Sequence, residues 1–318
     1  MKAIVCKAYG GPDDLVLEDL PSPQPRVGEV KVRLRARGVS FTDVLKIGGN
    51  YQVKDDPPFI PGGEACGEVL ELGANVTDLK VGDRVLCGGG FAEETVQPRS
   101  ACVRLAPNTD FNTAAAFRSN YCTAYYGLQR ARLQPGQTLL VHGAAGGVGL
   151  AAVDMGKLMG ATVIATARNA ERLKVCASLG ADHLIDYSDG FKDQVKELTG
   201  GRGADVVYDP VGGDVFDESM RCIAPFGRIL VVGFTAGRPA QAKTNHLLVK
   251  DAEIIGFTLG GLNRNDPGWA ERNLQQLITW LTHERIHPYY SHELPLAQAA
   301  DALKLIQERK VVGKVLLI

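Results

Sequence analysis

The fold of this chain is decided by the stretch Thr138-Leu139-Leu140-Val141-His142-Gly143-Ala144-Ala145-Gly146-Gly147-Val148-Gly149. A short apolar strand runs into glycines spaced three apart, and an apolar helical face follows up to Leu158. Such glycines let a backbone approach a pyrophosphate, whose charge then lies at the helix N-terminus. The pattern predicts a βαβ unit that cradles phosphate, and the alternative is a tight turn that binds nothing.

Strands and helices alternate after this turn. The further strands are predicted at residues 162–167, 183–186, 205–208, 227–232 and 253–259, with helices at 170–179, 191–199 and 214–222. The strands are short continuous apolar runs, as expected when helices cover both faces of a parallel sheet. The predicted fold class is therefore α/β, with a doubly wound parallel sheet of the Rossmann type.

The first hundred residues are predicted to be β-rich. Residues 30–37 alternate apolar with basic side chains, which is typical of a half-buried strand. Shorter strands are predicted at 2–8, 65–72, 84–87, 91–96 and 102–105. After the helices predicted at 269–282 and 296–308, a closing strand at 312–318 needs another sheet to join, so we expect it to return to the first domain. The expected domains are residues 1–122 with 264–318, and residues 123–263.

Composition excludes several classes of protein. The net charge of the 318 residues is −1, and no basic block is present, so neither nucleic acid nor an anionic membrane is an expected partner. The most apolar region, 139–167, is interrupted by charged residues and glycines, which argues against a membrane span. The seven cysteines are scattered without a C-x-x-C pair, which indicates reduced thiols and no structural zinc site. We expect a cytoplasmic protein.

The second strand of the βαβ unit indicates which nucleotide binds. An NAD site has an acidic residue at the end of this strand, whereas here the strand ends Ala167-Arg168-Asn169. A guanidinium suits a 2′-phosphate, so NADPH is the expected cofactor. The alternative is that Arg168 is a solvated surface residue and that Asn169 caps the next helix.

Several separated motifs occur in a specific order along the whole chain. They are Met1-Lys2-Ala3-Ile4, residues 38–43 (GVSFTD), 61–69 (PGGEACGEV), 81–85 (VGDRV), 144–149 (AAGGVG) and 208–213 (YDPVGG). With them the chain resembles the zinc-free quinone oxidoreductases, the zeta-crystallin-like branch of the medium-chain dehydrogenase/reductase superfamily. The resemblance implies a GroES-like catalytic domain formed by both chain ends around a Rossmann domain, a homodimer, and NADPH.

The resemblance also implies that no catalytic metal is bound. The zinc-dependent relatives have a cysteine at the position of Ser40 and a histidine at that of Gly63, and a short turn at 87–91 replaces their zinc-binding loop. Glu64 alone is not a metal site, and we expect it to hydrogen-bond within the domain. Without a Lewis acid, alcohol dehydrogenation is not expected.

The family pattern also implies which residues bind the cofactor. Gly143, Ala144, Gly146, Gly147, Val148 and Gly149 are expected at the pyrophosphate, Arg168, Asn169, Tyr187 and Arg309 at the adenosine phosphate, and Gly233, Phe234 and Thr235 near the nicotinamide. Two of these residues also have a purely structural alternative, because Tyr187 can simply end a strand and Arg309 can complement a helix dipole.

Quinones and α,β-unsaturated ketones accept hydride without a metal, because the developing charge delocalises. The resemblance implies candidates for hydrogen-bonding the acceptor, because they lie in the segments that line the cleft in the family: Ser40, Tyr51, Asn120 and Thr123. A loop tyrosine such as Tyr51 is also common as a packing residue. The expected function is NADPH-dependent reduction of a quinone or enone. The alternatives are an enoyl-thioester reductase and a non-enzymatic NADPH-binding structural protein.

Overall fold

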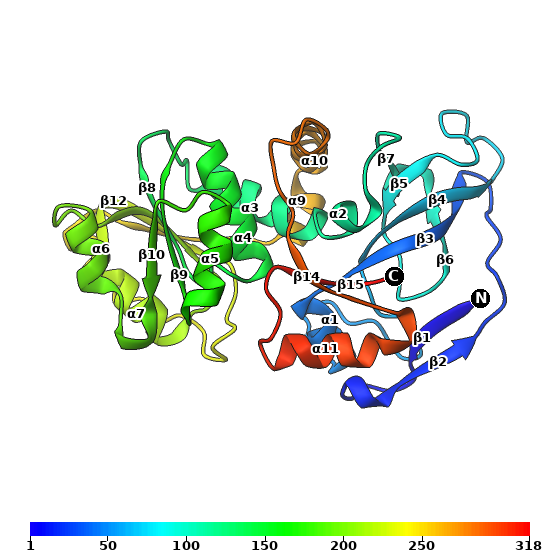
Figure 1. Ribbon diagram of the computed structural model, residues 1–318, viewed down its shortest axis with the longest axis horizontal. Coiled ribbons are helices and arrows are strands. Elements are labelled where there is room, and N and C mark those ends of the chain that lie inside the picture. The colour runs from blue at the N-terminus through cyan, green and yellow to red at the C-terminus, as the bar shows by residue number, and fades with distance from the viewer. The chain divides into compact units, whose positions relative to one another are not determined.

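The computed structural model describes residues 1–318, which form two compact units. Unit 1 comprises residues 1–118 and 288–318, and unit 2 comprises residues 119–287. The colours in Figure 1 show that both chain ends, blue and red, contribute to unit 1. Unit 1 is therefore discontinuous, whereas unit 2 is one uninterrupted segment.

Unit 2 is built on a six-stranded sheet with the order β10-β9-β8-β11-β12-β13. All neighbouring strands in it are parallel. The strands are β8 (Thr138–Val141), β9 (Thr162–Ala167), β10 (His183–Asp186), β11 (Ala204–Asp209), β12 (Ile223–Val231) and β13 (Glu253–Gly256). The strand order reverses between β8 and β11, which is the topological switch point of a Rossmann sheet. The predicted doubly wound parallel sheet is confirmed.

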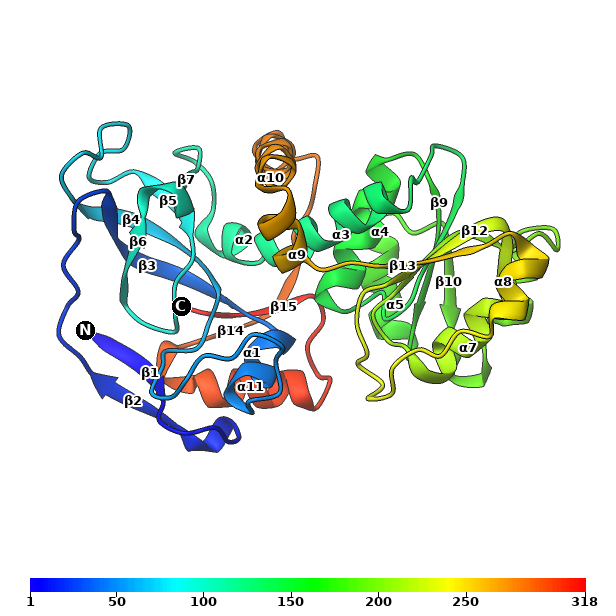
Figure 2. The same cartoon turned by 180° about the vertical axis from the view of Figure 1, so that it is seen from behind.

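Helices cover this sheet, and they are α3 (Arg118–Arg130), α4 (Gly147–Leu158), α5 (Ala170–Ser178), α6 (Lys192–Leu198), α7 (Gly213–Cys222), α8 (Thr244–Lys250), α9 (Leu259–Asn265) and α10 (Pro267–Thr282). Figure 2 shows α8 beside β12. One face of the sheet buries Leu140, Ile164, Val207 and Ile229 against Phe216 of α7. Continuous apolar strands are required because the sheet has no wet face.

Unit 1 contains a mainly antiparallel seven-stranded sheet with the order β14-β15-β3-β4-β5-β7, in which β6 also pairs with β3. Its strands are β3 (Glu29–Val39), β4 (Glu64–Leu72), β5 (Arg84–Cys87), β6 (Glu94–Pro98), β7 (Val103–Arg104), β14 (Tyr290–Leu294) and β15 (Lys314–Leu317), beside a hairpin of β1 (Lys2–Cys6) and β2 (Leu15–Asp19). The expected return of the last strand to the first domain is seen, because β15 pairs antiparallel with β3.

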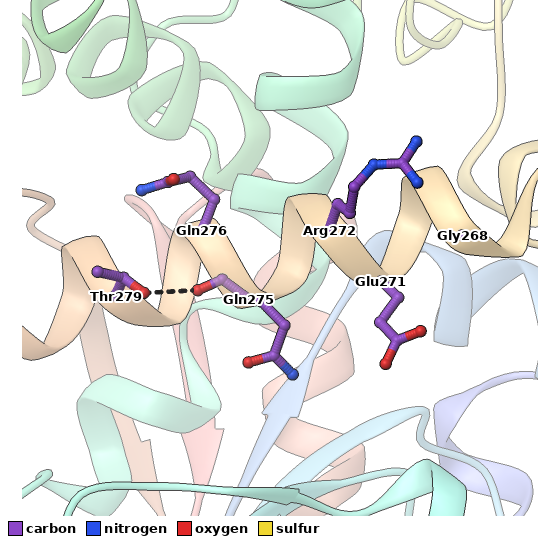
Figure 3. Close-up of a pocket in the computed structure, with 6 residues that line it drawn as sticks. All are labelled: Gly268, Glu271, Arg272, Gln275, Gln276 and Thr279. Atoms are coloured by element: carbon purple, nitrogen blue, oxygen red, sulfur yellow. Dashed lines mark hydrogen bonds between the residues drawn. The ribbon is translucent and has the colours of Figure 1, made fainter.

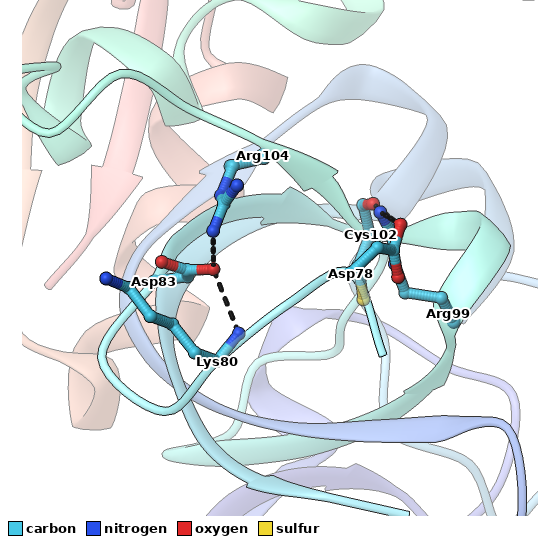
Figure 4. A network of polar contacts seen from close by, with 6 residues as sticks. All are labelled: Asp78, Lys80, Asp83, Arg99, Cys102 and Arg104. Carbon is cyan, nitrogen blue, oxygen red and sulfur yellow. Dashed lines mark hydrogen bonds and ion pairs between the residues drawn. The ribbon is translucent and has the colours of Figure 1, made fainter. Parts of the chain in front are cut away.

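Unit 1 also has three α-helices, α1 (Phe41–Ile47), α2 (Phe111–Ala115) and α11 (Ala299–Gln307). A loop before β5 is held by ion pairs: Arg99 binds Asp78 at 2.5 Å, and Arg104 binds Asp83 (Figure 4). The Asp83 carboxylate also accepts the Lys80 amide at 3.0 Å. These contacts fix the turns that lead into β5.

The units divide at 118/119 and 287/288, whereas the sequence led us to expect 122/123 and 263/264. The second difference arises because α10 packs within unit 2. The Gln129 carboxamide of α3 accepts from the Trp269 indole at 3.0 Å and from Asn273 at 2.7 Å. Trp269 also stacks edge-on against Tyr126, with ring centroids 5.1 Å apart. None of the helices combines the length and the apolar character that crossing a membrane demands.

Candidate functional site

The glycine loop lies at the switch point of the Rossmann sheet. The His142 amide donates to the Tyr208 carbonyl of β11 at 3.0 Å, and the Ala144 amide donates to the Thr166 carbonyl of β9 at 3.0 Å. The loop is therefore fixed to strands on both sides of β8. Gly143 has φ +53°, a left-handed conformation that favours glycine.

Helix α4 begins very close to this loop. A Cβ on Gly149 would lie 2.3 Å from the Gly143 carbonyl oxygen, so only glycine fits there. The first amide of the helix with a helical partner is that of Leu150, which donates to Gly146 at 2.8 Å. The amides of Gly147, Val148 and Gly149 therefore have no carbonyl to bind within the helix. They form a positive helix end suited to a phosphate group.

A buried histidine supports the loop from behind. The fully buried His142 ring contacts the Thr166 hydroxyl through Nδ1 at 2.9 Å and the Ser219 hydroxyl through Nε2 at 2.8 Å. Ser219 donates its own proton to the Val215 carbonyl, so it must accept from Nε2–H, and Nδ1 then accepts from Thr166. Burial lowers the pKa of His142 to about 3. The ring is therefore neutral and locked in one tautomer.

The chain after β11 forms the other wall of the switch point. The buried Asp209 carboxylate accepts the amides of Val211 at 2.8 Å and Gly212 at 2.9 Å, and burial raises its pKa. Thr235 donates its amide and its hydroxyl, each at 3.1 Å, to the carbonyl of Pro210. The segment Gly233-Phe234-Thr235 is thus fixed to the loop that follows β11, at the carboxyl edge of the sheet, where β8 also ends in the glycine loop.

The predicted adenosine-phosphate residues Arg168, Asn169 and Tyr187 cluster at the ends of β9 and β10. The exposed Arg168 guanidinium lies 5.8 Å from the centre of the Tyr187 ring. Asn169 has φ +71° and caps α5, since its side chain accepts the Arg172 amide at 3.2 Å. The structure thus confirms that Asn169 caps the helix, which was the alternative to a role in binding the nucleotide. Arg168 is the cation at the end of β9.

The two acceptor-site candidates in unit 2 lie on α3. Asn120 is buried, and its amide nitrogen is 2.6 Å from where a Cβ on Gly147 would lie, so it sits over the start of α4. Thr123 is one turn further along and donates its hydroxyl to the Ser119 carbonyl at 2.7 Å. Asn120 therefore lies beside the glycine loop and the first turn of α4.

The remaining candidates, Ser40, Tyr51 and Arg309, belong to unit 1. Ser40 is the N-cap residue of α1, and its backbone amide donates to the Asp43 carboxylate at 2.8 Å. Its hydroxyl donates to the same carboxylate at 2.9 Å and lies 2.6 Å from the Thr42 hydroxyl. Burial raises the pKa of Asp43. Tyr51 is half-buried in the loop after α1, and Arg309 follows α11 with φ +57°.

The residues at the expected zinc position do not fit a zinc ion. Glu64 is engaged by Lys314, whose Nζ lies 2.8 Å from its Oε2, with both side chains buried. The expected hydrogen bonding of Glu64 within its domain is confirmed. Ser40 bonds to Asp43, and Gly63 offers no ligand atom. No three His, Cys, Asp or Glu side chains converge in the structure.

Three residues that support the site were not predicted from the sequence: His142, Asp209 and Lys314. Asp209 had a readable signal, because an aspartate three residues before a glycine after a strand is typical of a side-chain-capped turn. A separate polar hollow runs along α10 and is lined by Gly268, Glu271, Arg272, Gln275, Gln276 and Thr279 (Figure 3). None of the predicted site residues lines this hollow.

Comparisons with known proteins agree with this geometry. Residues 147–280 match the model of the zinc-binding dehydrogenases, and residues 26–107 match that of the alcohol dehydrogenase GroES-like domain. A quinone oxidoreductase-like protein 2 homolog of Nematostella vectensis is 41% identical over 99% of this chain and 88% of its own. The chain belongs to the zinc-free quinone oxidoreductase branch of the medium-chain dehydrogenase/reductase superfamily.

Two other relatives of this family are informative about chemistry. The Escherichia coli quinone oxidoreductase, solved in complex with NADPH, is 27% identical, with a TM-score of 0.90 over 100% of both chains. A 2-haloacrylate reductase of a Burkholderia species is 32% identical over 100% of this chain and 98% of its own. The family thus includes proteins named for reducing quinones and for reducing an activated alkene.

Proposed function

We propose that this protein is an NADPH-dependent, metal-independent oxidoreductase that transfers hydride to a quinone or an α,β-unsaturated carbonyl compound. The observation that carries the proposal is the bare amide end of α4 at the switch point, with a cation instead of an acid at the end of β9. The NADPH complex of the Escherichia coli relative supports this choice of nucleotide.

The roles of the residues follow from the charges of the cofactor. The amides of Gly147, Val148 and Gly149 bind the pyrophosphate, with Gly143, Ala144 and Gly146 shaping the approach. Arg168 and Tyr187 bind the 2′-phosphate, with Asn169 holding the turn and Arg309 as a further cation. Gly233, Phe234 and Thr235 bound the nicotinamide end. NADPH, when bound, supplies the hydride.

The protein must then orient the acceptor and stabilise the oxygen on which charge develops. Hydrogen-bond donors serve this purpose where no metal is present. Ser40, Tyr51, Asn120 and Thr123 are the proposed donors. Because a hydroxyl has one proton to donate, Ser40 must release Asp43, and Thr123 must release the Ser119 carbonyl, when either binds the acceptor. The 2-haloacrylate reductase relative favours activated alkenes as acceptors beside quinones.

We also propose a cytoplasmic homodimer. Strand β13 ends the Rossmann sheet and pairs with β12 on one side. Its other edge offers backbone donors and acceptors to a second copy of the chain.

The test is a steady-state screen of NADPH and NADH against simple quinones, enals and enoyl-CoA thioesters, with zinc content measured on the same sample. We expect NADPH oxidation with quinones or enals and no requirement for zinc. Tyr51→Phe should lower turnover and leave NADPH affinity unchanged. Binding of neither nucleotide in a calorimeter, or turnover that depends on stoichiometric zinc, would refute the proposal.

A further inference from the structure

One buried carboxylate in unit 2 accepts hydrogen bonds from the segment in which the chain enters that unit and from the segment in which it leaves. Asp154 lies on α4 and is 5% exposed. Its Oδ2 accepts the Tyr121 hydroxyl at 2.7 Å and the His287 backbone amide at 2.6 Å. Its Oδ1 lies 3.2 Å from Nδ1 of the His287 ring.

These donors are defined by their place in the chain. Unit 2 begins after Arg118 and ends at His287. Tyr121 is therefore in the first turn of the entering helix, and His287 is the last residue before the chain leaves. Two segments that are far apart in sequence are tied to a single side chain.

The buried neighbours of Asp154 on α4 are apolar: Leu150, Ala151, Ala152, Val153 and Met155. Burying a carboxylate among them is unfavourable unless donors satisfy it. The phenol of Tyr121 stays protonated and so remains a hydrogen-bond donor, because burial and the adjacent Asp154 raise its pKa. The contacts thus explain why a carboxylate stands at this position.

We propose that Asp154 is a positioning residue, which holds the entering and the leaving segments of unit 2 on α4 and on which turnover therefore depends. The same helix carries Gly147 at its start, about 10 Å away along the axis at 1.5 Å per residue. The phosphate loop and Asp154 are therefore parts of one rigid element. Hydride transfer requires this precision, because a misplacement of about 1 Å can cost about 100-fold in rate.

The experiment compares Tyr121→Phe, Asp154→Ala and Asp154→Asn in the full chain. Asparagine keeps one oxygen that can accept from both Tyr121 and His287, so it is the conservative replacement. Asp205→Asn is the matched control, because Asp205 is also a buried carboxylate of unit 2 but binds the Thr138 amide instead. The measurements are NADPH affinity by fluorescence, kcat with a quinone, and the rate of trypsin cleavage after Arg118.

We expect Asp154→Ala and Tyr121→Phe to bind NADPH within about two-fold of the parent while kcat falls about ten-fold or more. Trypsin should cut after Arg118 several-fold faster, and Asp154→Asn should restore most of both properties. Asp205→Asn should leave both unchanged.

Two results would overturn the inference. One is parental kcat and parental proteolysis in folded Asp154→Ala and Tyr121→Phe variants. The other is a loss of NADPH affinity as large as the loss of kcat, which would make Asp154 a support of the nucleotide site instead. The kcat measurement rests on the proposed function, whereas the proteolysis measurement does not. A parent protein without reductase activity would therefore refute the proposed function, and the proteolysis rates would still decide the role of Asp154.

Discussion

The buried ion pair of Glu64 and Lys314 allows a quantitative test of unit 1. Glu64 lies on β4 and Lys314 on β15, on either side of β3. Their charged atoms are 2.8 Å apart, with side-chain exposures of 6% and 3%. Gly38 of β3 makes room for them, since a Cβ there would lie 2.8 Å from Lys314 Cε.

Replacing Glu64 by Gln keeps the shape of the side chain and removes its charge. Removing one partner of a buried pair costs about 3–5 kcal/mol, because the other charge loses its counter-ion in a low-dielectric environment. We expect Glu64→Gln and Lys314→Met each to lower the free energy of unfolding by about this amount. The melting temperature should fall on the order of 10 °C. The double variant Glu64→Gln with Lys314→Met removes both charges and should recover at least about 2 kcal/mol of the summed losses.

Denaturant unfolding of the four proteins completes the double-mutant cycle, and near-ultraviolet circular dichroism reports that each is folded. The reasoning fails if the single variants cost less than about 1 kcal/mol, or if the losses simply add. An additive result would mean that the two charges do not interact in the folded state.

Three further predictions concern unit 2. Gly149→Ala should weaken NADPH binding about ten-fold or more, because its Cβ would lie 2.3 Å from a backbone oxygen. The control Gly260→Ala in α9, whose Cβ would have its nearest contact at 3.8 Å, should have a small effect. Arg168→Gln should weaken NADPH binding roughly 10–100-fold and leave NADH binding unchanged, as the loss of one charge-assisted contact predicts. His142 should make stability depend on pH: its folded pKa is about 3, and its unfolded value is about 6.5, so its contribution is complete above the latter and is lost as the pH falls toward the former.

Each of these predictions has a distinct check. For the glycines, calorimetric titration with equal losses in both variants would contradict the close approach of α4. For Arg168, the control is Lys174→Gln on the exposed side of α5. An equal loss of NADPH affinity in the control would mean that the effect comes from the net charge of the protein and not from a contact with Arg168. For His142, the free energy of unfolding of the parent should fall by about 2 kcal/mol more than that of His142→Gln between pH 7 and pH 5. If chemical denaturation gives the same fall for both proteins, the histidine does not cause the pH dependence.

The parts of the fold that follow from local patterns could be predicted from the sequence. Each parallel strand is a short apolar run bounded by turn residues, and the glycine spacing specifies the first βα turn. The seven-residue helix α1 was missed because it is short, although Ser40 and Asp43 form the capping-box pattern that marks a helix start. Strand β14 was missed because its sequence, Tyr290–Leu294, is largely polar and no alternation is evident.

The parts that depend on register could not be predicted. Lys314 reaches Glu64 only because three strands align so that residues 250 positions apart face each other. The support of the glycine loop by His142 likewise depends on where Thr166 and Ser219 fall on two other elements. The periodicity of apolar residues along one segment carries no information about which residues of two distant segments come into contact.

The placement of β15 inside the sheet of unit 1 has a consequence for biosynthesis. Leu317, whose carbonyl accepts from Arg37, is separated from it by 280 residues. During synthesis the backbone groups of β3 that pair with β15 stay unpaired until residues 119–287 have been synthesised, and this segment can fold in the meantime. The nascent chain therefore carries a completed nucleotide-binding module next to an unfinished sheet, and the interval before β15 arrives is when that sheet is most exposed to wrong pairing.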